Sequence, residues 1–558
     1  MPQARRKTPF SGKAKKQQLQ NKKQNNVLLM QTTSSSDAYD VVSLNYQSTK
    51  SRGRSEANRY ALKFYRESDT ELAMKKEEAL KSLNPVSEED LEIDPAKYFP
   101  PDLTFPRRPP WDFSMTPAQL DAQEQRYFKN YIDSLRSSEH WKDMSYFELN
   151  LETWRQLWRV MEMCDILLLI VDVRYAGMMF PPSLYEYIVR EQNKAMILVL
   201  NKVDLVPAAV VAAWRAHFAV TYPGLKVVYF TSCPGYNLRG ATSDKAGLQV
   251  RRRKGRQRMC VEGATQILDA CKELVQGEVD LTPWEDKIRE EMHLDREDDE
   301  VEIGEMVLEK ADTTFYSHER YKNGVLTIGC CGQPNVGKSS LMNAVLGKKR
   351  LSVSKTPGHT KHFQTIYTTP QVRFCDCPGL VFPSKVPRPV QILMGSYPIA
   401  QLREPYTTIR YMAERMDLPK LLRIEHPEKD DTWSPRDICD GWARKRGYLT
   451  AKAARLDTYR AANSLLRMAL DGKISLCLRP PRFTQQKEKF ESSEEVKYVK
   501  WVQALTTDVA EALDVSDVGS DDNDDSPAER QSADQESSDD AEYTAAIANK
   551  FAALANDD

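Results

Sequence analysis

Gly332-Gln333-Pro334-Asn335-Val336-Gly337-Lys338-Ser339 is the stretch that decides the fold, because it matches the phosphate-loop pattern G-x-x-x-x-G-K-[ST] in full. An apolar run at Val325–Cys331 precedes it and a helical pattern at Ser340–Leu346 follows it, which is the strand, loop and helix order that the pattern requires. Backbone N–H groups of such a loop converge on a nucleotide phosphate. We expect all eight loop residues, and Ser340 after them, to contact a bound nucleotide.

Two side chains of this loop have distinct predicted roles. Lys338 supplies a positive charge to the β- and γ-phosphates, and the Ser339 hydroxyl is placed to ligate Mg²⁺. Downstream, Asp376-Cys377-Pro378-Gly379 follows another apolar run and matches the D-x-x-G element of nucleotide switches. We expect Asp376 to hold Mg²⁺ through water and the Gly379 amide to meet the γ-phosphate, with Pro378 beside the nucleotide.

The turn between these two elements, Thr356-Pro357-Gly358-His359-Thr360, is expected to be the first switch. Thr360 is the predicted Mg²⁺-contacting hydroxyl, and Thr356 is the alternative. Lys338, Thr360 and Gly379 are therefore the candidate catalytic residues, and Ser339, Thr360 and Asp376 are the candidate metal ligands.

A guanine-reading motif, Asn201-Lys202-Val203-Asp204, ends an earlier apolar run. Asp204 can accept from the two N–H groups on the guanine edge, Asn201 can meet the acceptor side, and the Lys202 stem can lie along the base. Adenine lacks that pair of donors and would leave the carboxylate unsatisfied. Behind the next apolar run, the backbone of Thr231-Ser232-Cys233 is predicted to touch the base, so Ser232 and Cys233 join the candidate site. The predicted ligand is GTP or GDP.

The guanine motif stands ahead of the phosphate loop, which reverses the order found in ordinary small GTPases. Three short apolar runs bounded by polar or turn residues predict buried parallel strands: Ile166–Val171, Met196–Leu200 and Val227–Phe230. Strand character returns at Val325–Cys331, Gln364–Thr368 and Val372–Cys375, with a β-hairpin expected between the phosphate loop and Asp376. Because parallel strands place their carboxyl ends at one edge of a sheet, every candidate loop can still meet there.

Flanking stretches carry a resemblance to a known family: Pro106–Trp111, Asn150–Val160, Val171–Arg174, Thr356–Thr365 and Tyr448–Arg455. Together with the reversed motifs, they resemble the circularly permuted GTPases of the YlqF and YawG type, in particular the guanine nucleotide-binding protein-like 1 branch, with Lsg-type large-subunit GTPases as relatives. The resemblance covers about residues 95 to 480. It implies an α/β fold, GTP hydrolysis with Mg²⁺, and a role in ribosome assembly.

The expected fold is a circularly permuted P-loop GTPase domain with a parallel-type sheet, a C-terminal helical domain and disordered tails. Residues 1–104 are expected to be a basic, partly disordered extension, 105–161 a helical lead-in, 162–389 the GTPase domain with an insertion at about 234–320, 390–482 the helical domain, and 483–558 an acidic disordered tail. Because the chain leaves Gly379 directly toward the helical domain, a γ-phosphate-dependent shift is expected to move that domain.

The residue after Gly379 bears on catalysis. Ras-like enzymes use a glutamine to orient the attacking water, whereas Leu380 cannot hydrogen-bond to water. We therefore expect the isolated protein to hydrolyse GTP slowly, or a catalytic group to come from elsewhere, such as a protein activator that the sequence does not identify. Within the chain, His359 and His362 are candidates for that group. Asn335 resembles the phosphate-loop asparagine of potassium-stimulated relatives, so K⁺ is a possible further cofactor.

The charge distribution indicates possible partners, although the net charge of the chain is only -1. The first thirty residues and the cluster Arg251–Arg258 are basic, so each could bind RNA or serve as a nuclear or nucleolar address. The family resemblance implies that such an RNA partner is ribosomal RNA or a pre-ribosomal particle. The acidic end contains Ser520, Ser526, Ser537 and Ser538, which suggests phosphorylation. With no apolar run near the ~20 residues of a membrane span and no signal peptide, we expect a nuclear, nucleolar or cytoplasmic protein that is not secreted and has no membrane partner.

Overall fold

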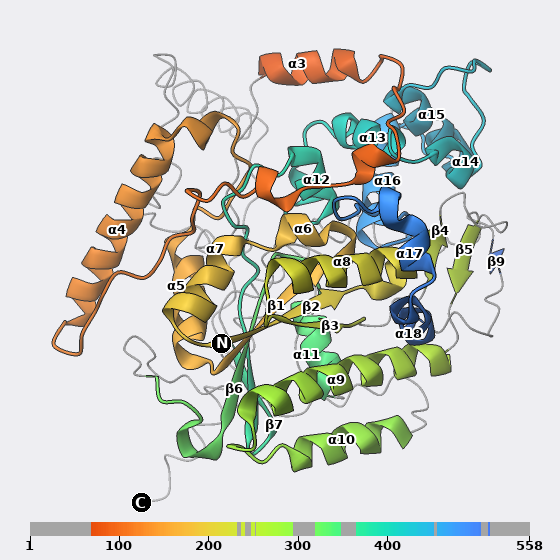
Figure 1. Cartoon of the computed structure of the whole chain (residues 1–558). Coiled ribbons are helices and arrows are strands. Elements are labelled where there is room, and N and C mark those ends of the chain that lie inside the picture. Colours follow the sequence, from red (N-terminus) through yellow and green to blue (C-terminus); the bar gives the residue numbers. More distant parts are fainter. Residues whose placement is uncertain are drawn as a thin grey trace, which may run out of the picture. The chain divides into compact units, whose positions relative to one another are not determined.

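A computed structural model describes residues 69–231, 236–239, 247–250, 253–293, 318–346, 364–450, 455–503 and 512–513. Its centre is a six-stranded sheet in the order β3-β2-β1-β6-β8-β7 (Figure 1). The strands are β1 Ile166–Asp172, β2 Ala195–Asn201, β3 Lys226–Tyr229, β6 Leu326–Cys331, β7 Gln364–Thr369 and β8 Val372–Asp376. All neighbours are parallel except β7, which runs antiparallel to β8.

These strands confirm the sequence prediction, since each end differs from the predicted apolar run by at most one residue. The clearest case is β1, in which every residue is buried. A continuous apolar run of this kind is typical of a parallel strand that is covered on both faces. The α/β fold with a mostly parallel sheet is therefore confirmed.

The position of β1 explains how the reversed motif order is accommodated. It lies between β2, which carries the guanine motif, and β6, which carries the phosphate loop. In the parallel register Asp172 pairs with Asn201, so these two strand ends are level. The loops that follow β1, β2, β6 and β8 thus meet at one edge of the sheet, although they are far apart in sequence.

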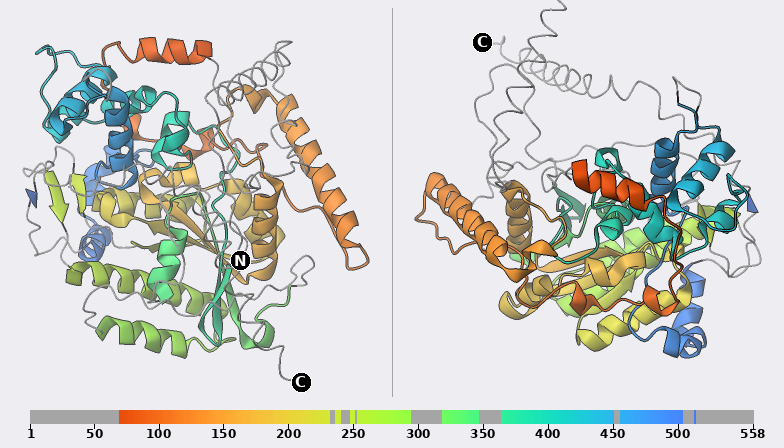
Figure 2. Two further views of the ribbon diagram at one scale, coloured as in Figure 1. Left: turned by 180° about the vertical axis from the view of Figure 1, so that it is seen from behind. Right: turned by 90° about the horizontal axis from the view of Figure 1, so that it is seen from above.

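Helices pack against this sheet (Figures 1 and 2). They include α5 Leu151–Met163 on β6, α6 Ala176–Met179 on β1, α8 Ala208–Thr221 and α9 Arg253–Val275 on β3, and α11 Lys338–Leu346 on β8. Among the described residues, further α-helices ahead of the C-terminal region are α3 Asp69–Glu78, α4 Pro117–Ser137, α7 Pro182–Tyr185 and α10 Thr282–His293. A small second sheet contains β4 Tyr236–Arg239, β5 Gly247–Val250 and β9 Ala512–Leu513.

Helix α9 lies within the stretch at about 234–320 that is expected to be an insertion of the GTPase domain. It packs on β3 and on α11, and a Cβ at Gly263 would lie 2.4 Å from the Phe230 ring. This stretch therefore contains a helix that covers the sheet. The basic cluster Arg251–Arg258 runs into the start of α9, with Arg251 and Arg252 outside the described residues.

The C-terminal region is helical, as predicted, but its ordered part is longer. Helices α12 Arg388–Leu393, α13 Tyr406–Ala413, α14 Leu418–Leu422, α15 Pro435–Arg446 and α16 Thr458–Leu470 form one packed group (Figure 2). Two further helices, α17 Lys487–Glu491 and α18 Glu494–Val502, pack on α8. The expected start of a disordered tail at residue 483 is therefore wrong, because residues up to Gln503 belong to the fold.

A segment that precedes the sheet, residues 83–98, also has fixed contacts with distant parts of the chain. Leu83 N–H donates to Trp433 O over 2.8 Å and Ile93 N–H donates to Arg479 O over 2.9 Å. Lys385 N–H donates to Tyr98 O over 2.8 Å. This stretch, which we call the N-terminal strap, lay within the extension expected to be partly disordered at 1–104. Within the described residues, no helix is both long enough and apolar enough to cross a membrane.

Candidate nucleotide-binding site

The phosphate loop connects β6 to α11 and is tightly packed. At Gly332, where φ is 150°, a Cβ would lie only 2.3 Å from the Ile170 carbonyl oxygen, so the position requires glycine. Gly337 has φ 96° and Asn335 has φ 58°, which curl the backbone into a left-handed turn. The Lys338 ammonium donates to Gly332 O over 3.1 Å and to Gln333 O over 2.8 Å. Burial lowers the pKa of Lys338. A phosphate nearby would have the opposite effect, because a negative charge stabilises the protonated ammonium.

Ser339 and Asp376, two of the candidate metal ligands, lie side by side. The Ser339 hydroxyl donates to Asp376 Oδ2 over 2.7 Å. Asp376, at the end of β8, is 1% exposed, and its Oδ1 has no hydrogen-bond partner among the described residues. Burial raises the pKa of Asp376, against the opposing effects of Lys338 and the Ser339 hydrogen bond. A buried carboxylate oxygen in need of a partner, next to a hydroxyl, is a set of hard oxygen donors that fits Mg²⁺.

The D-x-x-G element lies against the phosphate loop. A Cβ at Gly379 would approach Pro334 Cα to 2.8 Å, so the two backbones are in direct contact. Leu380 N–H donates to Gly332 O over 3.2 Å. The Leu380 side chain is 1% exposed, so it packs inside the protein and offers neither a polar group nor access to a water molecule.

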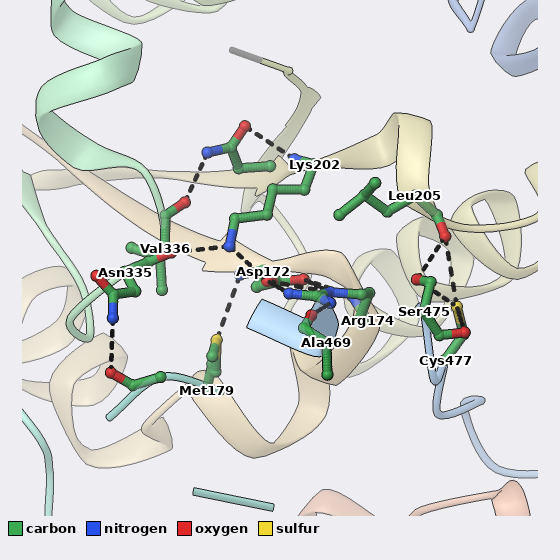
Figure 3. A network of polar contacts seen from close by, with 12 residues as sticks. Asp172, Arg174, Met179, Lys202, Leu205, Asn335, Val336, Ala469, Ser475 and Cys477 are labelled. Carbon is green, nitrogen blue, oxygen red and sulfur yellow. Dashed lines mark hydrogen bonds and ion pairs between the residues drawn. The ribbon is translucent and has the colours of Figure 1, made fainter. Parts of the chain in front are cut away.

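Residues of the guanine motif form hydrogen bonds with the backbone of the phosphate loop. The buried Asn201 side chain donates to Val336 O over 2.6 Å and accepts from Lys202 N–H over 2.8 Å. Lys202 adopts a left-handed conformation, with φ 61°. Its ammonium donates to Asn335 O over 2.8 Å and lies 2.9 Å from Asp172 Oδ2 (Figure 3). Burial lowers the pKa of Lys202, and the Asp172 charge opposes that effect.

Asp204 is oriented by the loop that follows β3. Its Oδ1 accepts from the Thr231 hydroxyl over 2.5 Å, and both residues are buried. The sequence predicts a backbone contact between this loop and the base, and the structure shows a contact of the Thr231 side chain with the Asp204 carboxylate. Such a bond fixes the rotamer of the carboxylate before any ligand arrives.

Several candidate residues lie outside the described residues: Ser232, Cys233, Thr356, His359, Thr360 and His362. Ser340 is in the first turn of α11 and is partly exposed. Its contact with a nucleotide stays a prediction, as do the roles of Thr360, Ser232 and Cys233.

A buried ion pair that the sequence reading did not assign supports Lys202. Asp172 ends β1 and accepts from the Arg174 backbone N–H, Nε and Nη2, the last over 2.7 Å. Burial alone would raise the pKa of Asp172, but Arg174 and Lys202 together hold it below its ordinary value. An acid and an arginine two residues apart, directly after a continuous apolar run, were the signal available in the sequence.

The C-terminal helices supply contacts to the phosphate loop. Asn335 Nδ2 donates to Gly395 O over 3.0 Å, and the Ser396 hydroxyl donates to Gln333 Oε1 over 2.7 Å. Gly395 has φ 76°, and a Cβ there would meet Asn335 Nδ2 at 2.8 Å. The loop after α12 is therefore fitted closely to the phosphate loop.

Comparisons with known proteins agree with this arrangement. A family model described as "50S ribosome-binding GTPase" matches residues 327–409. Proteins called "Guanine nucleotide-binding protein-like 1" from Rattus norvegicus and Homo sapiens are each 47% identical over 534 residues, which span 88% of this chain and 88% of theirs. "Large subunit GTPase 1 homolog" of Mus musculus is 30% identical over 431 residues, covering 68% of this chain and 66% of its own.

Among solved structures, GNP-bound YlqF from T. maritima is 18% identical and covers 59% of this chain and 97% of its own, with a TM-score of 0.33.

Proposed function

The chain belongs to the guanine nucleotide-binding protein-like 1 family of circularly permuted GTPases, and we propose that it acts as a molecular switch in ribosome biogenesis or a related ribonucleoprotein assembly step. As a member of that family, it binds guanine nucleotides and hydrolyses GTP. The observation that supports the assembly role is the match of residues 327–409 to a family described as ribosome-binding. The similarity to a large-subunit GTPase homolog points the same way.

The proposed site divides between the two motifs. Residues Gly332–Ser340 bind the phosphates, with Lys338 placed to neutralise charge on the transferred phosphoryl group. Asn201, Lys202, Asp204, Ser232 and Cys233 bind the guanine base. Because Gly379 contacts Pro334 closely, binding of a γ-phosphate at the phosphate loop would change the conformation of the segment that leads from Gly379 to α12.

Ser339 and Asp376, with Thr360, would hold a Mg²⁺ ion. Such an ion would supply positive charge to neutralise the negative charge that develops on the phosphates during hydrolysis. The chain's own contribution is to orient the ligands: Ser339 lies in the first turn of α11 and Asp376 ends β8, and their hydrogen bond holds the two oxygens together. No glutamine follows Gly379, so hydrolysis is proposed to be slow until another protein supplies a water-orienting group.

Sedimentation tests the assembly role. In a lysate supplied with a non-hydrolysable GTP analogue, the protein is expected to co-sediment with large-subunit precursors and to dissociate as salt is raised, because contacts with RNA phosphates release counterions. The Lys338→Ala variant under the same conditions is the matched control and is expected in the soluble fractions. Absence of the wild-type protein from every subunit fraction would overturn the assembly role.

That same outcome would favour a second function, a GTP-binding signalling or scaffold protein without a ribosomal role. The observation in its favour is that Gly395 and Ser396, beside the C-terminal helices, contact the phosphate loop directly. Nucleotide binding could then stabilise a docking surface on those helices without any part in ribosome assembly.

Potassium stimulation is a separate prediction that rests on Asn335. Its amide nitrogen is engaged by Gly395 O, so the amide oxygen is the atom that would contact the ion. GTP turnover is expected to be faster in K⁺ than in Na⁺ buffer at equal ionic strength. Equal rates in the two buffers, measured by phosphate release, would remove K⁺ from the proposal.

A further inference from the structure

We propose that the C-terminal segment Ala469–Gln503 is a positioning element for the guanine motif, with Gln503 as its main contact, so that base binding and docking of this segment are coupled. The inference rests on the proposed assignment of Asn201–Asp204 to the base. It goes beyond the expected link between the γ-phosphate and the helical domain, because it concerns the opposite end of the nucleotide.

Gln503 holds the loop that contains Asp204. Its side-chain amide donates to Val203 O over 2.7 Å and to Val206 O over 2.8 Å. Gln503 is 1% exposed, so both hydrogen bonds are made away from water. Loss of these donors would leave carbonyls unsatisfied in a buried setting, which favours a different loop conformation. Because Val203 directly precedes Asp204, that change would move the base-reading carboxylate.

The C-terminal segment also holds the carbonyl of Leu205, which lies between Val203 and Val206 in the same loop. It accepts from the Ser475 hydroxyl over 2.8 Å and from the Cys477 thiol over 3.6 Å (Figure 3). A Cβ at Gly472 would lie 2.6 Å from Leu205 Cδ1, so the Leu205 side chain fits directly against the segment. The backbone of the loop after Asp204 is thus held by residues that lie at least 270 positions later in the chain.

The C-terminal segment also contacts Lys202, which precedes Val203, indirectly through the buried ion pair of Asp172 and Arg174. Arg174 Nη1 donates to Ala469 O near the end of α16 over 2.7 Å, while the same guanidinium holds Asp172, which contacts the Lys202 ammonium (Figure 3). Leu478 N–H donates to Arg174 O over 2.9 Å. Both sides of the guanine motif are therefore supported from the C-terminal segment.

The segment itself has firm attachments to the sheet layer. Glu495 in α18 accepts from Arg215 and from the Tyr229 hydroxyl, and Gln266 donates to the Tyr498 hydroxyl. Gln503 follows α18 directly and so is presented from an anchored helix. By linkage, a segment that stabilises the base-binding conformation is itself stabilised when the base binds.

The first test compares Gln503→Leu with Gln485→Leu, the same change at an exposed position in the same segment. Two lost hydrogen bonds predict about tenfold weaker binding of a fluorescent GDP analogue for Gln503→Leu. The preference for GDP over ADP is expected to fall in parallel, and the loss for GTP to appear in KM more than in kcat. A purely structural role would lower thermal stability without changing the ratio of GDP to ADP affinity, and that result would overturn the proposal.

The second test uses hydrogen exchange of the full-length wild-type protein. Addition of GDP is expected to slow amide exchange in α18, residues 494–502, as well as in the phosphate loop. Protection of the phosphate loop with no change in α18 would contradict the coupling. Asp204→Asn is included to separate the two hypotheses. If it leaves GDP binding intact, the base assignment is wrong; if it weakens binding while Gln503→Leu behaves like Gln485→Leu, only the coupling fails.

Discussion

Substitution of Lys338 by alanine is expected to weaken GTP binding by at least about a hundredfold, since hydrogen bonds to charged groups contribute about 1.5–3 kcal/mol each and the ammonium can make more than one. The structure shows where this ammonium lies. It is buried in the phosphate loop and donates to two backbone carbonyls, Gly332 O and Gln333 O. A bound phosphate would compete with those carbonyls for the same donors. Titration with a fluorescent GTP analogue measures the effect.

Lys322→Ala is the matched control, because Lys322 is half exposed and precedes β6 at the end opposite the phosphate loop. It is expected to bind GTP like the wild type. Since Lys338→Ala also removes donors from two loop carbonyls, the thermal midpoints of both variants should be recorded. A folded Lys338→Ala protein with wild-type affinity would mean that the phosphate loop has been misread.

Asp204→Asn is expected to change which base is bound. The carboxylate can accept from both N–H groups of the guanine edge, and an amide cannot. We expect GTP affinity to fall by roughly a hundredfold or more, from two lost charge-assisted hydrogen bonds. Xanthine carries a carbonyl in place of the guanine amino group, so the new amide can donate to it. The variant should therefore bind XTP more tightly than GTP, as measured by competition against one labelled nucleotide.

The contacts of Asp204 indicate that the Asp204→Asn side chain keeps the orientation of the original carboxylate. Its Oδ1 accepts from the Thr231 hydroxyl, and an asparagine oxygen can accept the same bond, so the side chain should keep its orientation. Asp286→Asn, on the exposed face of α10, is the control for the loss of one negative charge. Unchanged GTP affinity in Asp204→Asn would show that this residue does not contact the base.

The sequence was most informative where structure is set locally. The β1 strand is a continuous apolar run, and Gly332 belongs to a contiguous eight-residue motif, although the contact that requires a glycine there is with Ile170 in the neighbouring strand β1. Both features can be recognised directly in the amino-acid sequence. The juxtaposition of Ser339 and Asp376 also followed, because strand ends in a parallel sheet share one edge.

Contacts between distant residues could not be predicted in the same way. Gln503 and Val203 are joined by one side-chain amide, and nothing near either residue indicates the partner. The helix α18 was missed for a related reason. Its composition is strongly charged, and the apolar positions Val496, Val499 and Val502 form one narrow buried face. Packing on α8 stabilises this helix, since an isolated helix of that length would be marginal in water.

The N-terminal strap has a consequence for biosynthesis. Leu83 pairs with Trp433, and Ile93 pairs with Arg479, so the strap is translated long before its partners exist. At about 5–20 residues per second, the roughly 350 residues between Leu83 and Trp433 take on the order of 20–70 s to emerge. During that interval Leu83 and Ile93 have no native partner to pair with. Until Trp433 and Arg479 have emerged, the backbone N–H groups of Leu83 and Ile93 can bond only to water or to nearer parts of the chain, so the strap takes its native place late in synthesis.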